Sequence, residues 1–544
     1  MPNTTCPSRQ LPVLIIGAGP VGLGLATDLG WRGIECLVVE KGDGTLVHPR
    51  ANTVNSRTME FCRRWGIAEE VRNAGAPPDF PPTILYLTSL QGWELARIER
   101  PTHGGHKPLP TTPERSQRCN QLWLDPILRK RVTSFPCVSL RYKTRFESFT
   151  ETADGVVATL TNLETGETET IAAQYLVACC GGGSSVRDAL GLTMEGTEVL
   201  SYHLNVFVRI DELWTRHDKG KAAFYFFVTD VGGYPSLIEL DGNRLWRLGL
   251  NFKSERVTAD AVEIDAIMRK LVGPGIPYEV ISVLPWTCRS IVADRWASGR
   301  VLLAGDAVHQ HGPAGGFGMN TGMGDAVDLG WKLEAMVRGW GGPRLLDSYV
   351  HERRPVAKRN VDEATDNMLK LVAAPSLAAI EDASPEGERV RARMREAILR
   401  DKSKQFISDG IALGYRYDAS PIVIPDGSPP PPSSTTEYVQ TSRPGARAPH
   451  AFLGDGRSTL DLFGRGFVLL DFGGAVNSSG QALLDAAHER GVPLSIERIG
   501  DPAIAALYER RLVLVRPDGH VAWRGDMLPA DIGVLIDTVR GAGA

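Results

Sequence analysis

The segment PVLIIGAGPVGLGLATDLGWRGIECLVVE, residues 12–40, constrains the fold more strongly than any other part of the chain. A short apolar run over residues 13–16 is typical of a buried strand and ends at a glycine turn. The following residues have apolar positions at helical spacing and stop near Gly33, after which a second apolar run ends at Glu40. This β-α-β order predicts parallel strands joined by a right-handed crossover.

The glycine turn carries the G-x-G-x-x-G spacing that a dinucleotide site requires. Gly17 permits the tight turn, Gly19 lets backbone approach a pyrophosphate, and Gly22 lets helix and strand pack closely. The helix start offers unpaired N–H groups to phosphates, and the carboxylate of Glu40 can accept hydrogen bonds from ribose hydroxyls. A glycine turn without a ligand is the alternative, and the pattern does not distinguish NAD from FAD. The predicted nucleotide-binding residues are Gly17, Gly19, Pro20, Val21, Gly22, Glu40 and Lys41.

The chain gives little sign of a membrane, nucleic-acid or metal partner. Arg9 and the apolar run after it have the outline of a signal peptide, but glycines and Asp28 interrupt that pattern, and no other stretch reaches the length of a membrane span. A net charge of −4 offers no attraction to nucleic acid. The eight cysteines lack C-x-x-C spacing, so neither a zinc site nor a disulfide framework is indicated. We therefore expect a cytoplasmic protein with reduced thiols.

At 544 residues the chain is too long for a single hydrophobic core. In its middle, the β-rich runs KAAFYFFV and PSLIELDGNRLWRLGLNF, the second broken by a turn at Asp241-Gly242, indicate an antiparallel sheet in a separate lobe. Further on, RVLLAGDA has the pattern of a buried strand, and a helical pattern follows it. Over residues 323–337 the apolar positions share one helix face, while Asp325, Asp328 and Lys332 lie off that face.

A proline- and serine-rich stretch, PDGSPPPPSSTTEY, separates the last part of the chain from the rest. This last part has another α/β pattern, in which GFVLLDF and RRLVLVRPDGHVAWRG are typical of strands and SGQALLDAAHERG of a helix. No cysteine follows Cys288, so this part cannot perform thiol–disulfide exchange. We expect a structural role or a dimer contact, which leaves a homodimer open.

A second glycine-rich loop, LLAGDAVHQHGPAGGFGMN, occupies residues 302–320. At this loop, and in GAGPVGLGLA, RANTVNSRTMEF and LLDSYVHERRPVA, the chain resembles the FAD-dependent aromatic hydroxylases built like p-hydroxybenzoate hydroxylase, the group A flavoprotein monooxygenases. The resemblance covers roughly residues 11–425. It implies that the two loops bind one FAD, with the adenosine at the first loop, the ribityl chain at Asp306 and the flavin ring along residues 313–320. The residues that it places near the flavin or along the pyrophosphate and ribityl chain are Arg50, Gln121, Asp306, Pro313, Gly316, Gly318, Met319 and Asn320.

The chemistry of a flavin fits this loop independently of the resemblance. Glycines let backbone touch a flat ring where a side chain would collide. Helix N-terminal amides around residues 320–322 would direct a positive dipole end at the negative charge of the reduced ring. Two alternatives remain, a glycine turn that only caps the helix and a metal site formed by Asp306, His309 and His311.

The resemblance also implies the fold class. This is α/β, with a Rossmann-type FAD-binding domain, an inserted β-rich substrate domain and, as in one branch of the family, a C-terminal thioredoxin-like domain without cysteines. The implied boundaries are residues 1–80, 119–190 and 286–375 for the FAD-binding domain, 81–118 and 191–285 for the substrate domain, 376–425 for a helical segment, 426–440 for a Pro/Ser linker and 441–544 for the thioredoxin-like domain.

One motif departs from the family pattern. Where members usually carry C-D-G-x-x-S-x-V-R, this chain has CCGGGSSVR at residues 179–187, so Cys180 replaces the aspartate. A thiol is a weaker hydrogen-bonding group than a carboxylate. Weaker flavin retention, altered nucleotide handling and compensation by neighbours all stay open, and we expect compensation because the other flavin motifs are intact. A redox-sensing Cys179–Cys180 pair is a further alternative.

The resemblance implies a cycle in which NADPH or NADH reduces FAD, and the reduced flavin captures O2 as a C4a-hydroperoxide that oxygenates a small aromatic substrate. We expect a phenol or hydroxypyridine substrate, with a polyketide-tailoring hydroxylase of the same family as the alternative. Substrate contacts should come from the β-rich lobe, where Tyr225, Tyr234 and Arg247 are candidates; Tyr225, Arg247 and Pro313 are the catalytic candidates. A halogenase is disfavoured because its W-x-W-x-I-P motif is absent, and only Cys180 favours a flavin-binding protein with a lapsed site.

Overall fold

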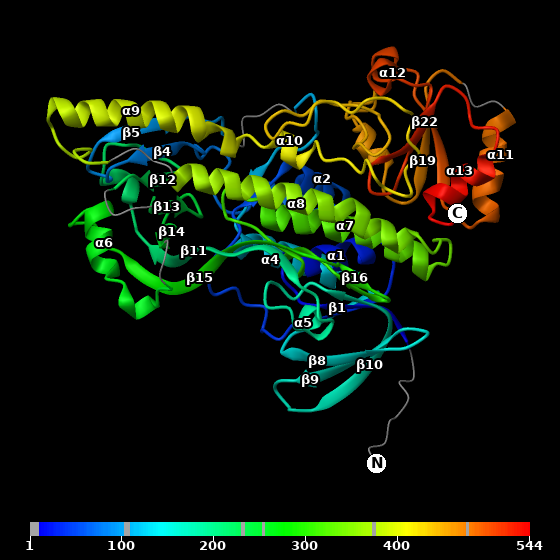
Figure 1. Ribbon diagram of the computed structural model, residues 1–544, viewed down its shortest axis with the longest axis horizontal. Coiled ribbons are helices and arrows are strands. Elements are labelled where there is room, and N and C mark those ends of the chain that lie inside the picture. The colour runs from blue at the N-terminus through cyan, green and yellow to red at the C-terminus, as the bar shows by residue number, and fades with distance from the viewer. Residues whose placement is uncertain are drawn as a thin grey trace.

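The computed structural model describes residues 10–102, 109–229, 234–252, 256–372, 377–474 and 478–543. It is elongated, with a β-rich lobe at one end, a central α/β domain and a smaller α/β domain at the other end (Figure 1). Segments from several parts of the chain build the lobe and the central domain. Residues 441–543 form the domain at the far end, called the C-terminal domain below.

The central domain is built on a sheet of strand order β16-β17-β10-β1-β2-β7. The pairs from β17 to β7 are parallel, and β8 and β9 extend the sheet from β10 as antiparallel strands. Helix α1 (Pro20–Arg32) crosses from β1 to β2 and ends at Gly33 in the left-handed conformation, as the sequence predicts. The strands are β1 (Leu11–Ile16), β2 (Cys36–Val39), β7 (Val138–Arg141), β8 (Thr144–Glu151), β9 (Val156–Asn162), β10 (Thr168–Ala178), β16 (Ala297–Ser298) and β17 (Val301–Leu303).

Helices cover this sheet, and α7 (Phe317–Val337) is the most deeply buried of the long ones described (Figure 1). The sequence suggested an apolar face with polar residues off it, but Asp325, Asp328 and Lys332 are each at most 1% exposed. The polar side of α7 is covered because α8 (Leu345–Val372) lies across it and buried ion pairs form there. The smaller helices of this domain are α2 (Ser56–Arg64), α3 (Ala68–Arg72), α4 (Gln121–Thr133) and α5 (Ser185–Ala189).

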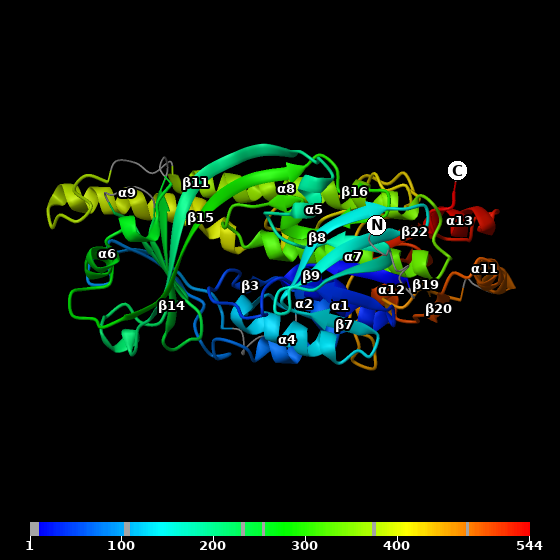
Figure 2. The same cartoon turned by 90° about the horizontal axis from the view of Figure 1, so that it is seen from below.

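The β-rich lobe is built on a second sheet, of order β18-β15-β11-β14-β13-β12-β4-β5. Its long strands β11 and β15 run side by side from the lobe toward the central domain (Figure 2). The predicted turn at Asp241-Gly242 joins β13 to β14, with Gly242 at φ +71° and Asp241 Oδ1 accepting the N–H of Asn243 at 2.9 Å. The strands are β4 (Ile84–Leu87), β5 (Glu94–Ile98), β11 (Met194–Arg209), β12 (Phe224–Phe227), β13 (Ser236–Glu239), β14 (Leu245–Phe252), β15 (Glu279–Ala293) and β18 (His309–Gln310).

The C-terminal domain has a sheet of order β20-β19-β21-β22, in which only the β19–β20 pair is parallel. Its apolar core continues into the central domain, where Trp331 and Trp340 pack with Phe467 and Leu469. The likeness of this domain to thioredoxin stays a prediction. Its elements are β19 (Phe467–Asp471), α11 (Ser478–Glu489), β20 (Leu494–Arg498), α12 (Pro502–Tyr508), β21 (Leu512–Val515), β22 (Val521–Gly525) and α13 (Ile532–Val539).

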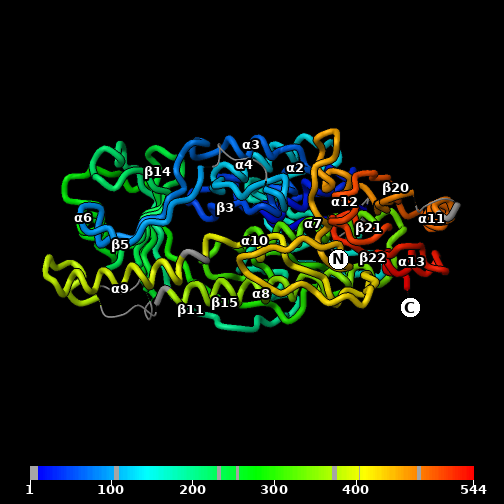
Figure 3. The backbone as a smooth tube through the Cα atoms, turned by 90° about the horizontal axis from the view of Figure 1, so that it is seen from above, coloured from blue at the N-terminus to red at the C-terminus, as the bar shows by residue number. Residues whose placement is uncertain are grey.

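The proline- and serine-rich stretch follows helices α9 (Pro385–Asp401) and α10 (Asp409–Ala412) and leads to the C-terminal domain (Figure 3). It has no regular secondary structure, yet it packs against both domains that it joins. Arg359 donates to the carbonyl of Ser434 at 2.8 Å, and Arg524 pairs with Asp426 at 2.7 Å. Among the residues placed in the structure, no helix is long and apolar enough to cross a membrane.

Candidate functional site

Loops that are far apart in the sequence meet at one edge of the central sheet. Strands β2, β1, β10 and β17 are consecutive parallel neighbours, so their carboxyl ends lie at the same edge. The segments that begin at this edge contain Glu40, Gly17, Cys180 and Asp306 respectively. Ligands of parallel α/β sheets bind at such an edge. The two glycine loops are therefore neighbours in space.

The first glycine loop has the shape that a pyrophosphate requires. Gly17 has φ +104°, and a Cβ at this residue would lie 2.5 Å from the carbonyl oxygen of Cys179. A Cβ on Gly22 would lie 1.9 Å from the carbonyl oxygen of Gly17, so the helix packs on the turn too closely for any side chain. Gly19, the N-cap of α1, has no atom within 4 Å of such a Cβ. The open side of the loop therefore coincides with the helix N-terminus, where phosphates bind.

Glu40 completes this end of the site. One of its carboxylate oxygens accepts the N–H of Ala18 at 2.9 Å and the other accepts the N–H of Gly42 at 2.8 Å, which fixes the carboxylate beside the glycine turn. Each oxygen retains a lone pair for a ribose hydroxyl. Pro20 occupies the first turn of α1, where its missing N–H costs no helix bond, and Lys41 is exposed.

The second loop reaches the first through Val21. Gly305 has φ +64°, and a Cβ at this residue would lie 2.9 Å from Cγ2 of Val21. A Cβ on Gly322 would lie 2.5 Å from the same methyl group. The second loop and α7 can meet the start of α1 only because both residues lack side chains. Asp306, next to Gly305, is exposed at this junction and can offer its carboxylate to a ligand.

Helix α7 begins at Phe317, with Gly316 as its N-cap at φ +67°. Its unpaired N–H groups are therefore those of residues 317–320, because the first four amides of a helix lack intrahelical partners. The sequence predicted these N-terminal amides around residues 320–322, so the predicted start of the helix was nearly one turn too late. The positive end of the helix dipole still lies at the end of the second loop, where it favours negative charge on a ligand.

The side chain of Asn320, predicted to line the flavin, makes four hydrogen bonds within the protein. Its Oδ1 accepts the N–H of Asn55 at 2.9 Å and the hydroxyl of Thr58 at 2.8 Å. Its Nδ2 donates to the carbonyls of Thr53 at 2.9 Å and Gly316 at 2.8 Å. The amide therefore fastens the segment before α2 to the start of α7.

The other predicted residues of the second loop leave its backbone accessible. Pro313 and Gly316 are exposed, and Gly318 and Met319 are partly exposed. A Cβ on Gly318 would meet nothing nearer than Nδ1 of His311, at 3.7 Å. Burial lowers the pKa of His311 well below its usual range, so this ring is neutral at physiological pH.

Arg50 and Gln121 lie on adjoining segments, since the N–H of Gln121 donates to the carbonyl of Ala51 at 2.9 Å. The Arg50 side chain is exposed, whereas Gln121 is buried and donates to Asp125 at 2.9 Å. Burial raises the pKa of Asp125 to about 7. This carboxyl group was not predicted, and its position four residues after Gln121 on α4 is the signal that could have found it.

The thiol of Cys180 is partly buried and contacts a neighbouring hydroxyl group. Its sulfur lies 3.0 Å from the hydroxyl of Ser184, and burial raises the pKa of both Cys180 and Cys179. Raised thiol pKa values oppose the thiolate that a redox-sensing pair would need. Arg187 links this segment to the second glycine loop by donating to the carbonyl of Ala307 at 3.3 Å.

The proposed metal set of Asp306, His309 and His311 does not assemble. Nε2 of His309 contacts Oδ2 of Asp325 at 2.8 Å, and both side chains are fully buried. In the described part of the chain, these three residues are not among the groups whose ligand atoms come close enough to share an ion. The metal alternative is therefore not supported.

Strand register places the two catalytic candidates of the lobe on opposite faces of its sheet. Arg247 is opposite Phe207 on β11 and Ile238 on β13, whereas Tyr225 is opposite Leu237. The face of Arg247 is polar and aromatic and includes His203, Asn205, Ser236, Asn251, Ser282 and Trp286. The face of Tyr225 is apolar, packs against α6 (Ile264–Leu271) and includes Leu204, Val206, Leu237, Trp246 and Leu248.

Tyr225 is therefore a core residue, which disfavours the prediction that it is catalytic. It is fully buried, and its hydroxyl donates to the carbonyl of Gly220 at 2.8 Å. Tyr234 is also mostly buried, in an apolar cluster with Tyr86 and Ile380. Of the three lobe candidates, Arg247 is the one that strand pairing places among the polar side chains of the sheet.

Arg247 is a partly buried cation without an acidic partner among the residues that the structure places. Its Nη1 donates to the carbonyl of Arg50 at 3.0 Å, and its Nε has no hydrogen-bond partner. Burial, with a contribution from Arg118, lowers the pKa of Arg247 to about 10, so it stays protonated at neutral pH. His48 lies nearby, with its Nδ1 2.9 Å from the hydroxyl of Ser282. Burial, together with the positive charges of Arg247 and Arg50, lowers the pKa of His48 to about 4.

Sequence reasoning missed most of this polar face. His203 stacks on Trp286 with ring centroids 4.2 Å apart and an interplanar angle of 19°, which makes a flat aromatic surface. The signal was the placement of polar or small residues at every second position in HLNV and RLGLN, at residues 203–206 and 247–251.

Comparison with known proteins also indicates an FAD-binding aromatic-ring hydroxylase. A family model described as FAD binding domain matches residues 10–364, and one described as aromatic-ring hydroxylase, C-terminal, matches residues 441–541. The structure of chromopyrrolic acid-soaked RebC with bound 7-carboxy-K252c superposes with a TM-score of 0.91 at 42% identity, covering 98% of this chain and 99% of that chain.

Two characterised relatives cover almost the whole chain. Tetracenomycin A2 monooxygenase-dioxygenase from Streptomyces glaucescens is 33% identical over 565 residues, which is 96% of this chain and 95% of that protein. 4-methyl-5-nitrocatechol 5-monooxygenase from Burkholderia sp is 32% identical over 570 residues, which is 99% of this chain and 98% of that protein.

The residues present fit the cofactor that these comparisons imply. A Cβ would fill the cradle at Gly17 and Gly22, whereas the position at Gly19 is open, as a pyrophosphate needs. Glu40 is fixed beside that cradle, and the exposed Asp306 lies at the neighbouring loop. The N-terminus of α7 lies at the end of this second loop.

Proposed function

The chain belongs to the FAD-dependent aromatic-ring monooxygenases, and from this premise we propose that it oxygenates a large fused-ring aromatic acid, with NADPH or NADH as reductant and O2 as co-substrate. We favour this substrate class over a single-ring phenol because identity to RebC, whose structure holds 7-carboxy-K252c, exceeds identity to the nitrocatechol monooxygenase. Arg247 carries the proposal on the structural side.

A carboxylate on the substrate would give Arg247 the partner that the described residues do not supply. A buried guanidinium is costly to leave unpaired, and a bidentate carboxylate satisfies it in both charge and geometry. The neighbouring rings of His203 and Trp286 offer a flat surface to fused aromatic rings. His48 stays neutral, so it adds polarity without a second charge.

The tautomer of His48 adds a second recognition element. The hydroxyl of Ser282 donates to the carbonyl of Val47 at 3.3 Å, so its oxygen accepts from Nδ1–H of His48. Nε2 is then an acceptor, and it has no partner among the described residues. An aromatic acid that also bears an O–H or N–H donor would satisfy both Arg247 and His48.

The chemistry that FAD supplies when bound is the transfer of two electrons from NAD(P)H to O2, which yields an oxygenating agent. The residues of this chain would orient the substrate, exclude water and stabilise negative charge. Arg247 orients the acid group of the substrate, the polar face and the loop before α7 enclose the reacting ring against water, and the N-terminus of α7 favours negative charge.

Aerobic NADH and NADPH oxidation with a panel of aromatic compounds tests the proposal. We expect fused-ring carboxylic acids to stimulate oxidation and to yield an oxygenated product by mass spectrometry, and single-ring phenols and methyl esters of the acids to do so weakly. Replacing Arg247→Met should raise KM for the acid by about 10–100-fold, since hydrogen bonds to charged groups contribute about 1.5–3 kcal/mol.

The matched control is Tyr225→Phe, on the opposite face of the same sheet. It should leave KM and kcat unchanged and lower stability by about 1 kcal/mol, the contribution of one hydrogen bond. Equal turnover of acid and ester, or an unchanged KM in Arg247→Met, would contradict the proposed substrate class while leaving the family assignment intact.

A further inference from the structure

Asp325 joins the second glycine loop to the helices behind it. Its Oδ2 accepts the N–H of Gly305 at 3.1 Å and contacts Nε2 of His309 at 2.8 Å, so one oxygen holds both ends of the short segment that contains Asp306. Its Oδ1 accepts from Nε of Arg353, on α8, at 2.9 Å. The carboxylate is fully buried.

Asp325 acts as an anion at this position. Although burial alone would raise the pKa of its carboxyl group, His309 and Arg353 outweigh it and lower that pKa. The guanidinium of Arg353 also donates to the carbonyl of Thr321 at 2.9 Å. A Cβ on Gly324 would lie 2.6 Å from Nη2 of Arg353, so this glycine in the helix is required for the guanidinium to pass.

The residue before Arg353 connects α8 to the C-terminal domain. Glu352 accepts from Nη1 of Arg516 at 2.5 Å and from Nζ of Lys332 at 2.6 Å. Arg516 also contacts Asp518 at 2.6 Å, and Asp328 at 3.4 Å. All of these side chains are at most 3% exposed.

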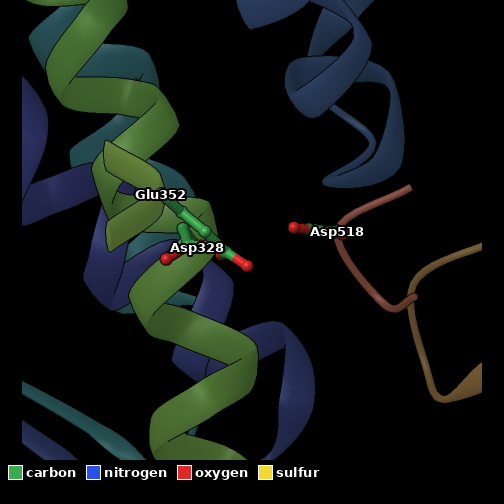
Figure 4. A group of neighbouring side chains, drawn as sticks. All are labelled: Asp328, Glu352 and Asp518. Carbon is green, nitrogen blue, oxygen red and sulfur yellow. The ribbon is translucent and has the colours of Figure 1, made fainter. Parts of the chain in front are cut away.

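Three acidic side chains of this cluster point toward one another from α7, α8 and the loop before β22 (Figure 4). Asp328, Glu352 and Asp518 have oxygen atoms within 4.8 Å of one another, close enough in principle to hold a metal ion. Lys332 and Arg516 contact these same oxygens, so cations of the chain already fill that position.

The acidic groups of the cluster contact two cations, Lys332 and Arg516. Burial raises the pKa of Asp328 well above its usual range. Burial also opposes ionisation of Glu352 and Asp518, but Arg516 and its neighbouring cations overcome it and lower both pKa values. Lys332 and Arg516 are the cations that oppose the negative charge of these carboxyl groups. Removing Arg516 would leave an uncompensated negative charge between α7 and α8.

A second route joins the same elements. Arg353 donates from Nη1 to the hydroxyl of Tyr417 at 3.3 Å. The ring of Tyr417 packs on that of His520, in the C-terminal domain, with centroids 4.3 Å apart, and the guanidinium of Arg516 lies over Tyr417 at 5.1 Å. Ionic and aromatic contacts therefore run without a break from the C-terminal domain to Asp325.

We infer that Asp325 is a positioning residue for the flavin-binding loop, and that the C-terminal domain, through Arg516, holds α7 and α8 in the arrangement that Asp325 needs. The C-terminal domain would then act in retention of the flavin end of FAD without touching it. This role requires no thiol, which agrees with the absence of cysteine after Cys288.

Binding of FAD and of ADP to the apoprotein tests the inference, because ADP occupies only the nucleotide end. In Asp325→Asn the amide nitrogen cannot accept a hydrogen bond, so either Gly305 or Arg353 loses its acceptor. We expect the Kd for FAD to rise by about 10–100-fold and the Kd for ADP to stay within about twofold of wild type. Asp325→Glu, which keeps the carboxylate, should recover part of the FAD affinity.

The part of the inference that concerns the C-terminal domain is tested by a matched pair of variants, Arg516→Lys and Arg447→Lys. Both arginines are fully buried in the C-terminal domain and pair with a buried glutamate of the central domain, but Arg447 contacts Glu60 on α2, whereas Arg516 contacts Glu352 on α8. A lysine keeps the charge and loses the bidentate geometry, so both variants should fold with similarly lowered melting temperatures. Only Arg516→Lys should weaken FAD relative to ADP, by about threefold or more.

Three results would overturn the inference. The first is an unchanged Kd for FAD in Asp325→Asn. The second is an equal loss of FAD and ADP binding in that variant, which would indicate general unfolding. The third is the same FAD-to-ADP ratio in Arg516→Lys and Arg447→Lys. Because ADP binding is measured in parallel, failure of the dinucleotide site itself would be recognised separately.

Discussion

The two loops that are predicted to bind the nucleotide end and the flavin end of FAD are built in different ways. The nucleotide end consists of one contiguous segment, residues 12–42, in which glycines and backbone amides provide the surface. The flavin end is a short loop held by Asn320 and Asp325 of the following helix and, from more distant parts of the chain, by Arg187 and Arg353. A local motif can specify backbone shape, whereas holding a loop from outside requires tertiary ion pairs and hydrogen bonds.

Substitution of the glycines in the first loop should have the largest effects on stability and on FAD binding. Gly22→Ala places a methyl group 1.9 Å from a backbone oxygen, so we expect a loss of about 3 kcal/mol of stability and no detectable FAD binding. Gly19→Ala has open space for its methyl group and should keep the apoprotein stability within about 0.5 kcal/mol while weakening both FAD and ADP. Chemical denaturation and ligand titration measure both quantities. Equal stability of the two variants would contradict the packing assigned to Gly22.

Acid should act on the ion pairs that hold the C-terminal domain. Burial opposes ionisation of Glu60, but Arg447 and Arg57 overcome it and lower its pKa to about 2. Because this pKa is depressed, its stabilisation is complete above the unfolded value near 4.5 and is lost as the pH falls toward 2. The loss amounts to about 3 kcal/mol, measured by urea unfolding across that range. The double variant Glu60→Gln/Arg447→Met should show a shallower pH dependence, and an unaltered slope would contradict this assignment.

Glu40→Gln should affect the nucleotide end alone. The carboxylate accepts two backbone N–H groups, and the amide of glutamine would set a donor against one of them. We expect the Kd values for FAD and ADP to rise together, by about tenfold. A loss confined to FAD would place Glu40 at the other end of the cofactor.

The smallest effect should come from the residue that departs from the family pattern. Cys180→Ser replaces the thiol by a hydroxyl that can keep the bond to Ser184, so the Kd for FAD should stay within about twofold of wild type. Fluorescence titration of the apoprotein would measure it. A tenfold loss would show that the sulfur itself contributes to cofactor retention.

The sequence sufficed to predict the elements whose signals are local. The strand before Gly17, helix α1 and the turn at Gly242 all follow from short patterns, whereas the adjacency of the two glycine loops was implied by the family resemblance. The family resemblance added the cofactor and the class of reaction, which the comparisons confirm.

The errors came from residues whose partners are distant in sequence. Asp325, Asp328 and Lys332 have the spacing of a solvent-facing helix side, and nothing near them reveals that Arg353 and Arg516 will bury them. Tyr225 lies in a run, FYFFV, that is apolar on both sides, so the pattern could not indicate its face. Only the pairing with β13 settles it, whereas the alternation around Arg247 was informative on its own.

The most direct test of a single FAD spanning both loops is calorimetric titration of the apoprotein with FAD, with and without saturating ADP. The account predicts one FAD per chain and competition by ADP. It also predicts that Asp306→Asn weakens FAD by about tenfold and leaves ADP binding unchanged. Binding of FAD alongside ADP without competition, or two FAD molecules per chain, would contradict it.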